Sequence, residues 1–151
     1  MATEKRARAT WEGDLVNGSG HVTTGTGSVD ADMTWSARAE DVEGPSPEEL
    51  IAAAHATCVS MALSAGLARA GTPPTRLETE ATTAFDKVGE GFKLTSVRLT
   101  IRGEVEGVDE DAFRQAAEDA KDNCPVSQAL KGNVDISVDA ALTSQTGARS
   151  G

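Results

Sequence analysis

The chain has 151 residues and a mass of 15.6 kDa, which fits one domain of common size. With 38% hydrophobic and 25% charged residues it has the composition of a soluble globular protein, and we expect no apolar run long enough to span a membrane. Its 14 basic and 24 acidic residues give a net charge of −10, which argues against nucleic acid and anionic lipid as partners.

The N-terminal segment, residues 1–11, is basic but has no apolar core, so we expect no signal peptide and a cytoplasmic protein. Aromatic residues are scarce, with two Trp, three Phe and no Tyr. The core is therefore expected to consist of Ala, Val, Leu and Ile. A core of such small residues favours an oligomer whose subunits share it.

The first third of the chain is predicted to form strands and turns. Residues 9–16 form a short extended run that ends at Asn17-Gly18, a dipeptide typical of a two-residue hairpin turn. The Thr- and Gly-rich residues 19–28 favour a second, mostly solvated strand, and residues 33–38 a third. A loop is expected at residues 41–45.

Residues 46–71 carry signals for a long helix at both ends. Ser46 is expected at the N-cap and Pro47 at the first helical position, and Glu49 completes an S-x-x-E capping box. Gly71 is expected just after the end of the helix, where the two prolines that follow prevent its continuation. Between these ends the residues are apolar almost all round, which predicts a helix buried inside the protein.

The rest of the chain is predicted to contain three strands and a second helix. The strands are expected at residues 76–88, 92–105 and 133–142, with a hairpin turn at 89–91. An amphipathic helix is expected at 109–123, and Pro125 restarts one further turn that ends at Leu130. The order βββ-α-ββ-α-β is typical of an α+β fold with an antiparallel sheet. We expect one domain at residues 1–143 and a flexible tail at 144–151.

The two cysteines, Cys58 and Cys124, are the candidate functional residues. Cys58 is predicted in the middle of the long helix, where burial would raise its pKa and make it inert unless a cation lies nearby. Cys124 precedes Pro125, and the N–H groups of a new helical turn would lower the pKa of its thiol. Local electrostatics therefore favours Cys124 as the more acidic thiol. In a reducing cytosol the two could be inert buried thiols, metal ligands or a redox pair.

A metal site has little support in the sequence. His55 and Cys58 have the spacing of metal ligands and Cys124 could add a third, but structural zinc generally takes four. The other histidine, His21, lies in a Thr- and Gly-rich hairpin. We therefore expect His55 to be a core or interface histidine that hydrogen-bonds to backbone. The chain also lacks the G-x-S-x-G motif of serine hydrolases and a phosphate-binding glycine loop before a helix.

Two segments closely resemble the cysteine motifs of one bacterial family. They are SPEELIAAAHATCVSMAL at residues 46–63 and NCPVSQAL at residues 123–130. Both are similar to the motifs of the OsmC/Ohr family, the osmotically inducible and organic hydroperoxide resistance proteins, and they occur in that family's order. WEGD at residues 11–14 and the hairpin around residues 86–88 resemble the OsmC branch. The resemblance covers nearly the whole chain except the tail.

The resemblance implies a thiol-dependent peroxidase that reduces organic hydroperoxides to alcohols, and hydrogen peroxide less efficiently. Cys58 would attack the peroxide, and Cys124 would resolve the sulfenic acid as a Cys58–Cys124 disulfide. This assignment overrules the local estimate that favours Cys124 as the more acidic thiol. An external dithiol, lipoyl-linked in related proteins, would restore the thiols by exchange. The resemblance implies no metal, flavin or heme cofactor.

The resemblance also implies that Arg38 activates Cys58 and that Glu48 orients the arginine. A guanidinium would stabilise the thiolate and could hydrogen-bond to the sulfur and to a peroxide oxygen. Glu49 is an alternative partner for Arg38, although its position in the capping box accounts for it. On the residues alone, Glu48 would serve only the helix dipole and Arg38 would be a solvated strand residue.

The family's fold implies an intertwined homodimer, with antiparallel sheets around a central buried helix that carries the first cysteine and with sites at the subunit interface. Two other functions stay open. One is a redox-responsive binding or sensor protein that uses the same disulfide without turnover. The other is a structural dimer whose thiols are inert.

Overall fold

The computed structural model of the protein describes residues 2–40 and 42–143. The predicted tail at 144–151 lies outside the described residues. The chain divides into two compact units, Met1–Leu50 and Ile51–Gly151, which are described separately below.

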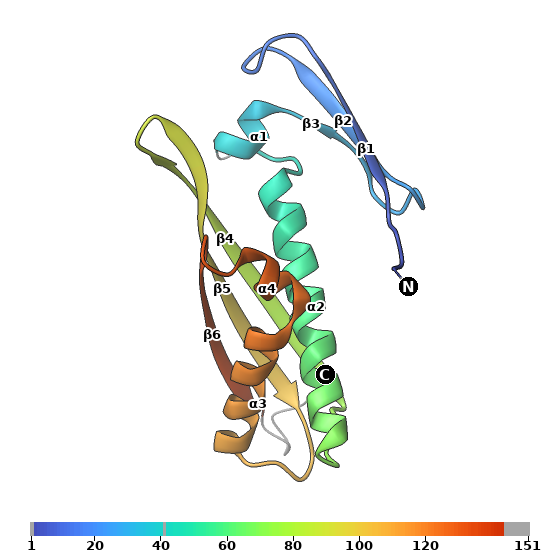
Figure 1. Ribbon diagram of the computed structural model, residues 1–151, viewed down its shortest axis with the longest axis vertical. Coiled ribbons are helices and arrows are strands. Elements are labelled where there is room, and N and C mark those ends of the chain that lie inside the picture. The colour runs from blue at the N-terminus through green and yellow to red at the C-terminus, as the bar shows by residue number, and fades with distance from the viewer. Residues whose placement is uncertain (1, 41, 144–151) are drawn as a thin grey trace. The chain divides into compact units, whose positions relative to one another are not determined.

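The first unit contains a three-stranded antiparallel sheet in the order β1-β2-β3 (Figure 1). The strands are β1 (Ala7–Glu12), β2 (Ser19–Thr24) and β3 (Asp30–Met33). β2 ends at Thr24 and not at the predicted Ser28, because the chain turns there. The Thr24 N–H donates to the carbonyl of Val29 at 2.9 Å, and Gly27 in the turn has a φ of 78°.

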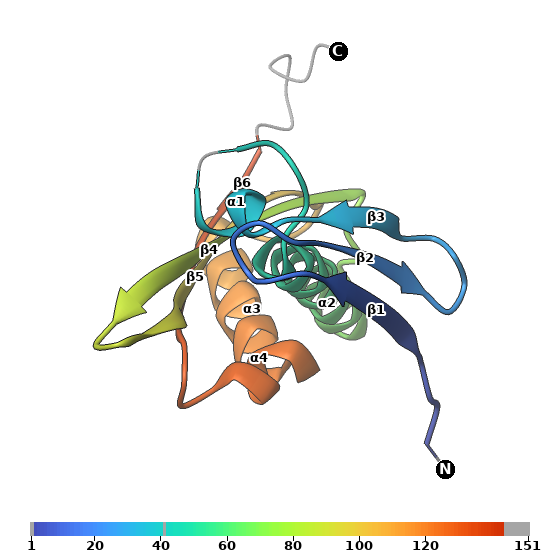
Figure 2. The same cartoon turned by 90° about the horizontal axis from the view of Figure 1, so that it is seen from above.

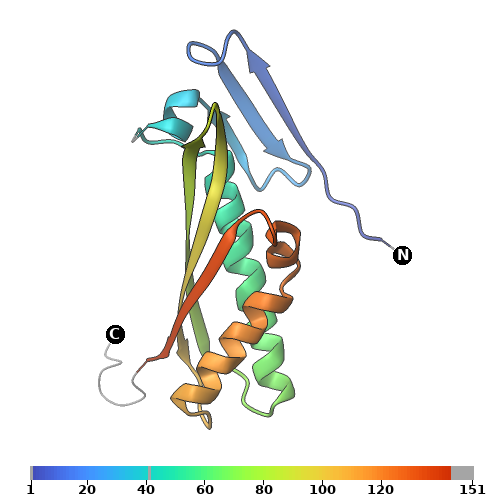
Figure 3. The same ribbon diagram turned by 60° about the vertical axis from the view of Figure 1, so that its left-hand side comes forward.

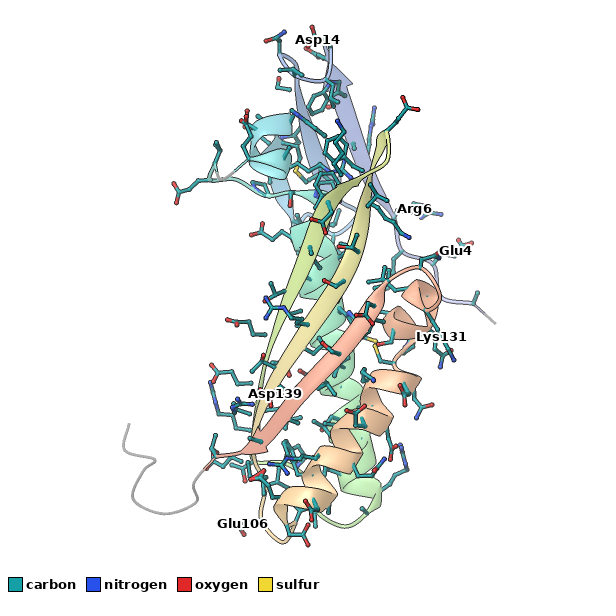
Figure 4. The ribbon with its side chains drawn as sticks, turned by 90° about the vertical axis from the view of Figure 1, so that its left-hand side faces the viewer. Glu4, Arg6, Asp14, Glu106, Lys131 and Asp139 are labelled. Atoms are coloured by element: carbon teal, nitrogen blue, oxygen red, sulfur yellow. The ribbon has the colours of Figure 1, made fainter. Side chains whose placement is uncertain are left out.

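The connection from β1 to β2 is longer than the predicted two-residue turn. Glu12 pairs with Ser19, so residues 13–18 form the loop. Asp14, seen in this loop in Figure 4, accepts the Asn17 N–H through its carboxylate at 2.7 Å and the Gly18 N–H through its carbonyl at 2.9 Å. The prediction of a tight turn at Asn17-Gly18 is wrong because Asp14 satisfies these two backbone donors in a wider loop.

The predicted third strand at residues 33–38 is also wrong. β3 ends at Met33, and the short helix α1 (Trp35–Ala39) follows. Thr34 has extended backbone and its hydroxyl accepts the Ala37 N–H at 3.2 Å, which satisfies a donor that the first helical turn would leave free. Arg38 therefore lies in the last turn of a helix and not on a strand.

The long helix α2 (Pro47–Arg69) begins and ends as predicted. The Glu49 N–H donates to the hydroxyl of Ser46 at 3.1 Å, which is the predicted N-cap bond. At the other end Gly71 has a φ of 89°, its N–H donates to the Ala68 carbonyl at 3.0 Å, and the Thr72 N–H donates to the Leu67 carbonyl at 2.9 Å. This pair of bonds is a Schellman motif, which explains why glycine follows the helix.

The expectation that α2 is buried all round is wrong for the single chain. A stripe at four-residue spacing is fully or almost fully buried: His55, Val59, Leu63 and Leu67. Met61, on another face, is 67% exposed. α2 is also long and apolar enough to cross a membrane by length and composition, contrary to our expectation. Its buried stripe belongs to the core of the second unit, so we assign it as a core helix.

The second unit contains a three-stranded sheet in the order β4-β5-β6. β4 (Arg76–Val88) and β5 (Gly91–Glu104) form the predicted antiparallel hairpin. β6 (Asp135–Leu142) pairs with β5 in parallel, so the sheet is mixed and the prediction of a purely antiparallel sheet is wrong. The reason is the connection: α3 (Glu110–Asn123) and α4 (Pro125–Leu130) carry the chain back before β6 begins.

The second unit's helices cover one face of this sheet (Figure 3). Figure 2 shows α3 beside α2, and both contribute to one core. Among the described residues, that core consists of aliphatic and small residues and one buried phenylalanine, Phe113, as the composition predicts. Phe113 packs directly on Gly103 of β5, where an added Cβ would lie 2.4 Å from a ring carbon. The open face carries charges, including the Arg102–Asp139 pair at 3.6 Å, with Asp139 on β6 in Figure 4. The α+β prediction is confirmed.

Candidate active site

Both cysteines lie in the second unit, one on each of two packed segments. Cys58 is partly buried on α2, beside the buried stripe. Cys124 is fully buried and lies between α3 and α4, where it is the last cap of one helix and the first cap of the other. Its extended backbone, with φ −62° and ψ 132°, is the conformation that a residue before proline favours. Pro125 thus favours the backbone conformation from which the Cys124 side chain projects.

The two thiols are brought together although 66 residues separate them in sequence. Both cysteines are free, and the two side chains lie close enough for Cys124 to raise the pKa of Cys58. The first turn of α4 contacts both sulfurs as well. The Val126 N–H hydrogen-bonds to Cys58, and the Ser127 N–H donates to the Cys124 sulfur at 3.5 Å. The N–H groups that the sequence placed near Cys124 therefore serve both thiols.

The surroundings of Cys58 raise its pKa. Burial is the largest cause because it disfavours the thiolate, and the neighbouring Cys124 acts in the same direction. The Val126 N–H opposes this by hydrogen-bonding to the sulfur, but it does not reverse it. A raised pKa keeps the thiol protonated at neutral pH, so a reactive Cys58 requires a further positive charge.

An arginine–carboxylate pair lies in the first unit. Arg38 donates from Nε to one oxygen of Glu48 at 3.0 Å and from Nη2 to the other at 2.9 Å. The carboxylate is largely buried, whereas a third of the Arg38 side chain is exposed. Such a two-point contact fixes the direction of the guanidinium plane. The partner of Arg38 is therefore Glu48 and not Glu49, whose N–H is at the Ser46 cap.

A cavity of about 440 Å³ opens beside Arg38 within the first unit. Its lining is mainly apolar and includes both tryptophans of the chain, Trp11 and Trp35, together with Met33 and Leu50. The ionisable side chains in this lining are those of Arg38 and His21. The cavity is therefore suited to binding the apolar part of a small ligand beside the Arg38 guanidinium.

The histidines have partners that sequence reasoning missed. His55 is fully buried, and its Nε2 lies 2.7 Å from the Ser127 hydroxyl oxygen, so the prediction of a bond to backbone is wrong. His21 lies between two carboxylates, Asp30 at 2.5 Å and Asp32 at 2.7 Å. Alternation along β2 and β3 could have indicated the His21 cluster, because Asp32 pairs with His21 across the sheet. Within residues 2–40 and 42–143, no group of three or more His, Cys, Asp or Glu is arranged to hold a metal ion.

The family model described as OsmC-like protein matches residues 39–139. The chain belongs to the OsmC-like family. This confirms the resemblance inferred from the two cysteine motifs, both of which lie entirely within the matched range.

Relatives of this OsmC-like chain extend the match over most of its length. It is 42% identical to Peroxiredoxin OsmC of Escherichia coli over 137 residues, which are 90% of this chain and 96% of the relative. It is 34% identical to Organic hydroperoxide resistance protein OhrA of Bacillus subtilis, over 75% of this chain and 79% of the relative. The crystal structure of OhrB of Bacillus subtilis superimposes with a TM-score of 0.71 at 29% identity, and covers 89% of this chain and 97% of that chain.

Proposed function

We propose that this protein is a thiol-dependent peroxidase that reduces organic hydroperoxides to alcohols. The observation that carries the proposal is that the two free thiols, Cys58 and Cys124, lie beside each other, so that Cys124 raises the pKa of Cys58. Relatives named peroxiredoxin and organic hydroperoxide resistance protein support it. Two inert thiols would have no functional reason to be neighbours when they are 66 positions apart in the sequence.

The reaction proceeds in three steps. The Cys58 thiolate attacks the terminal oxygen of the hydroperoxide, the O–O bond breaks, and the alcohol leaves after taking up a proton, so that Cys58 becomes a sulfenic acid. The Cys124 thiol then attacks that sulfur, which forms the disulfide and releases water. An external dithiol, such as a lipoyl group, exchanges with the disulfide and regenerates both thiols as it is itself oxidised.

Arg38 and Glu48 supply the activating charge in this proposal. Because burial and Cys124 raise the pKa of Cys58, the thiolate needs a cation that stays charged in a dry site, which a guanidinium does. Glu48 holds the Arg38 guanidinium at two points, which fixes the orientation of its plane. The site forms when these four side chains meet in the assembled protein.

The assembled protein is a homodimer with its sites at the subunit interface. In a single chain, α2 leaves apolar side chains such as Met61 exposed, and a second copy would bury them. An organic hydroperoxide suits the apolar cavity beside Arg38 better than hydrogen peroxide does, because its carbon chain would displace water from the tryptophan-rich lining. A cytoplasmic location fits a dithiol-dependent cycle.

The experiment is an intact-mass measurement of the reduced protein after one equivalent of cumene hydroperoxide. The unaltered chain should lose two hydrogens per chain as the disulfide forms. Cys124→Ser should gain one oxygen as the sulfenic acid of Cys58, and Cys58→Ser should leave the peroxide unconsumed. Ser137→Ala, on the exposed edge of β6, is the matched control for a serine-sized change. An unchanged mass in the unaltered chain would mean that the thiols are inert and would overturn the proposal.

Turnover distinguishes an enzyme from a sensor that forms the same disulfide. With excess cumene hydroperoxide and dihydrolipoamide, a peroxidase consumes many equivalents of peroxide per chain. A single equivalent consumed, with the disulfide persisting in the presence of the dithiol, would instead identify a redox-responsive binding protein.

A further inference from the structure

A buried side-chain pair connects the helix that carries Cys58 to the turn that carries Cys124. The Nε2 atom of His55, on α2, lies 2.7 Å from the hydroxyl oxygen of Ser127, on α4. His55 is fully buried and Ser127 is 4% exposed. The reaction steps above use neither side chain.

Each member of this pair lies next to one of the reacting sulfurs. His55 precedes Cys58 by three residues on α2, a spacing that puts two side chains on neighbouring parts of a helix surface. Ser127 donates its backbone N–H to the Cys124 sulfur at 3.5 Å, and the N–H of the preceding Val126 lies close enough to Cys58 to lower the pKa of its thiol. The His55–Ser127 bond therefore ties to α2 the same short segment that contacts both sulfurs.

Packing alone does not account for a histidine at position 55. Its Nδ1 is buried and has no hydrogen-bond partner within the described residues. A buried polar atom without a partner costs free energy, and a leucine could occupy a similar volume without that cost. What histidine provides at this position is the bond from Nε2 to Ser127.

We propose that His55 is a positioning residue that, through Ser127, holds Cys124 against Cys58 for disulfide formation. This inference rests on the proposed peroxidase. In the step concerned, the Cys124 sulfur attacks the sulfur of the Cys58 sulfenic acid, the S–S bond forms, the S–O bond breaks, and the oxygen leaves as water with the proton of the Cys124 thiol. The attack requires the sulfurs to stay in contact and aligned, so a looser segment slows it.

The test measures the two chemical steps separately. Rapid mixing with cumene hydroperoxide, followed by quenching, alkylation and mass measurement, gives the rate at which sulfenic acid becomes disulfide. His55→Leu and Ser127→Ala should each slow this step about tenfold, the size of effect expected for one lost buried hydrogen bond. In a Cys124→Ser background, His55→Leu should change the oxidation rate of Cys58 by about twofold or less, since positioning acts on the second step.

A second readout needs no peroxide. Equilibration with dithiothreitol should show the disulfide about tenfold less favoured in His55→Leu and Ser127→Ala, which is about 30 mV toward a less negative potential for this two-electron couple. A purely structural role would lower the unfolding midpoint without this shift. Because this measurement does not depend on peroxidase activity, it tests the positioning even where the proposed function fails.

Conservative and control variants complete the experiment. His55→Gln, whose side-chain amide can reach the Ser127 hydroxyl, should recover most of the lost rate, and Ser137→Ala should match the unaltered protein. The double variant should be no slower than either single variant, because both remove the same bond. Disulfide formation and potential unchanged in His55→Leu, or an equal loss in both chemical steps, would overturn the inference. Should His55→Leu fail to fold, Ser127→Ala decides alone.

Discussion

The guanidinium of Arg38 is held by Glu48 at 3.0 and 2.9 Å, which leaves its orientation little freedom. Cys58, in contrast, lies where burial raises the pKa of its thiol. These two observations concern single residues: an arginine with a fixed orientation, and a thiol that stays protonated at neutral pH. In the proposed mechanism Arg38, oriented by Glu48, supplies the positive charge that the Cys58 thiol needs.

Removing the guanidinium should make Cys58 less reactive. In Arg38→Ala the thiolate would lose its stabilising charge, so the pKa of Cys58 should rise and its alkylation by iodoacetamide at pH 7 should slow about tenfold. Arg76→Ala, an exposed arginine in another region, is the matched control. An unchanged alkylation rate in Arg38→Ala would show that another cation, with Arg69 or Arg98 as the next candidates, acts on the thiol.

The two histidines predict opposite contributions to stability as pH changes. Burial lowers the pKa of His55, so below about pH 6.5 the unfolded chain binds a proton that the folded chain resists, and stability falls as pH decreases. Hydrogen bonds to Asp32 and Asp30 raise the pKa of exposed His21, so its contribution is present at low pH and is lost as pH rises through the raised value.

Variants separate these contributions. Urea unfolding between pH 5 and 8 should show a loss of stability below about pH 6.5 that is smaller in His55→Gln than in the unaltered protein. His21→Asn, in which the opposing contribution is removed, should steepen the same loss. Equal pH profiles for the unaltered chain and His55→Gln would contradict the assignment of the acid sensitivity to His55.

At the scale of elements, helix ends follow local rules and were predictable. Ser46 caps α2 and Gly71 follows it, because capping involves only residues within one turn. The wrong predictions involve competing local bonds. Asp14 widens a loop that was predicted to turn tightly at Asn17-Gly18, and Thr34 starts a helix where a strand was expected. The parallel pairing of β6 with β5 was not predicted either. The direction of β6 depends on the end of the sheet to which α3 and α4 carry the chain.

The glycine after α2 offers a test of these helix-end rules. Gly71 has a φ of 89° and nothing near its missing Cβ, so Gly71→Ala should cost about 1 kcal/mol of unfolding free energy through backbone strain alone. Gly66→Ala, inside the same helix and with only the end of Arg69 nearby, should instead stabilise by about 0.5–1 kcal/mol. Urea unfolding measures both, and equal effects would refute the left-handed cap as the cause.

For the molecule as a whole, α2 is the helix whose apolar surface stays partly exposed in the single chain. It is a 23-residue apolar helix whose single-chain environment buries one stripe and leaves Met61 67% exposed. The proposed homodimer would cover such surface. We expect light scattering to give about twice the 15.6 kDa chain mass.

Met61→Glu should weaken this dimer because it would place a charge on a surface that assembly buries. Light scattering at micromolar concentration should show a shift toward monomer together with loss of peroxidase activity. Ser137→Glu on exposed β6 serves as the matched charge control. A Met61→Glu protein that stays dimeric and active would place the interface elsewhere.

Mixed dimers test whether the site is shared between subunits. Cys58→Ser and Arg38→Ala are each expected to be inactive or nearly so alone. If the arginine of one subunit serves the cysteine of the other, co-expressed heterodimers regain one intact site and about half the activity per dimer. Heterodimers without activity would show that both residues must belong to the same chain.

Local patterns were enough to predict α2, α3 and α4, the α+β class and the family, because capping, periodicity and motif identity are all properties of neighbouring residues. The short helix α1, in contrast, was predicted as a strand. The family resemblance implied that Arg38 pairs with Glu48 and Cys58 with Cys124, whereas the contact of His55 with Ser127 across 72 positions of chain emerged from the folded structure alone. Such contacts depend on how helices pack on the sheet, and packing responds to shape and burial over the whole unit, which no local pattern encodes.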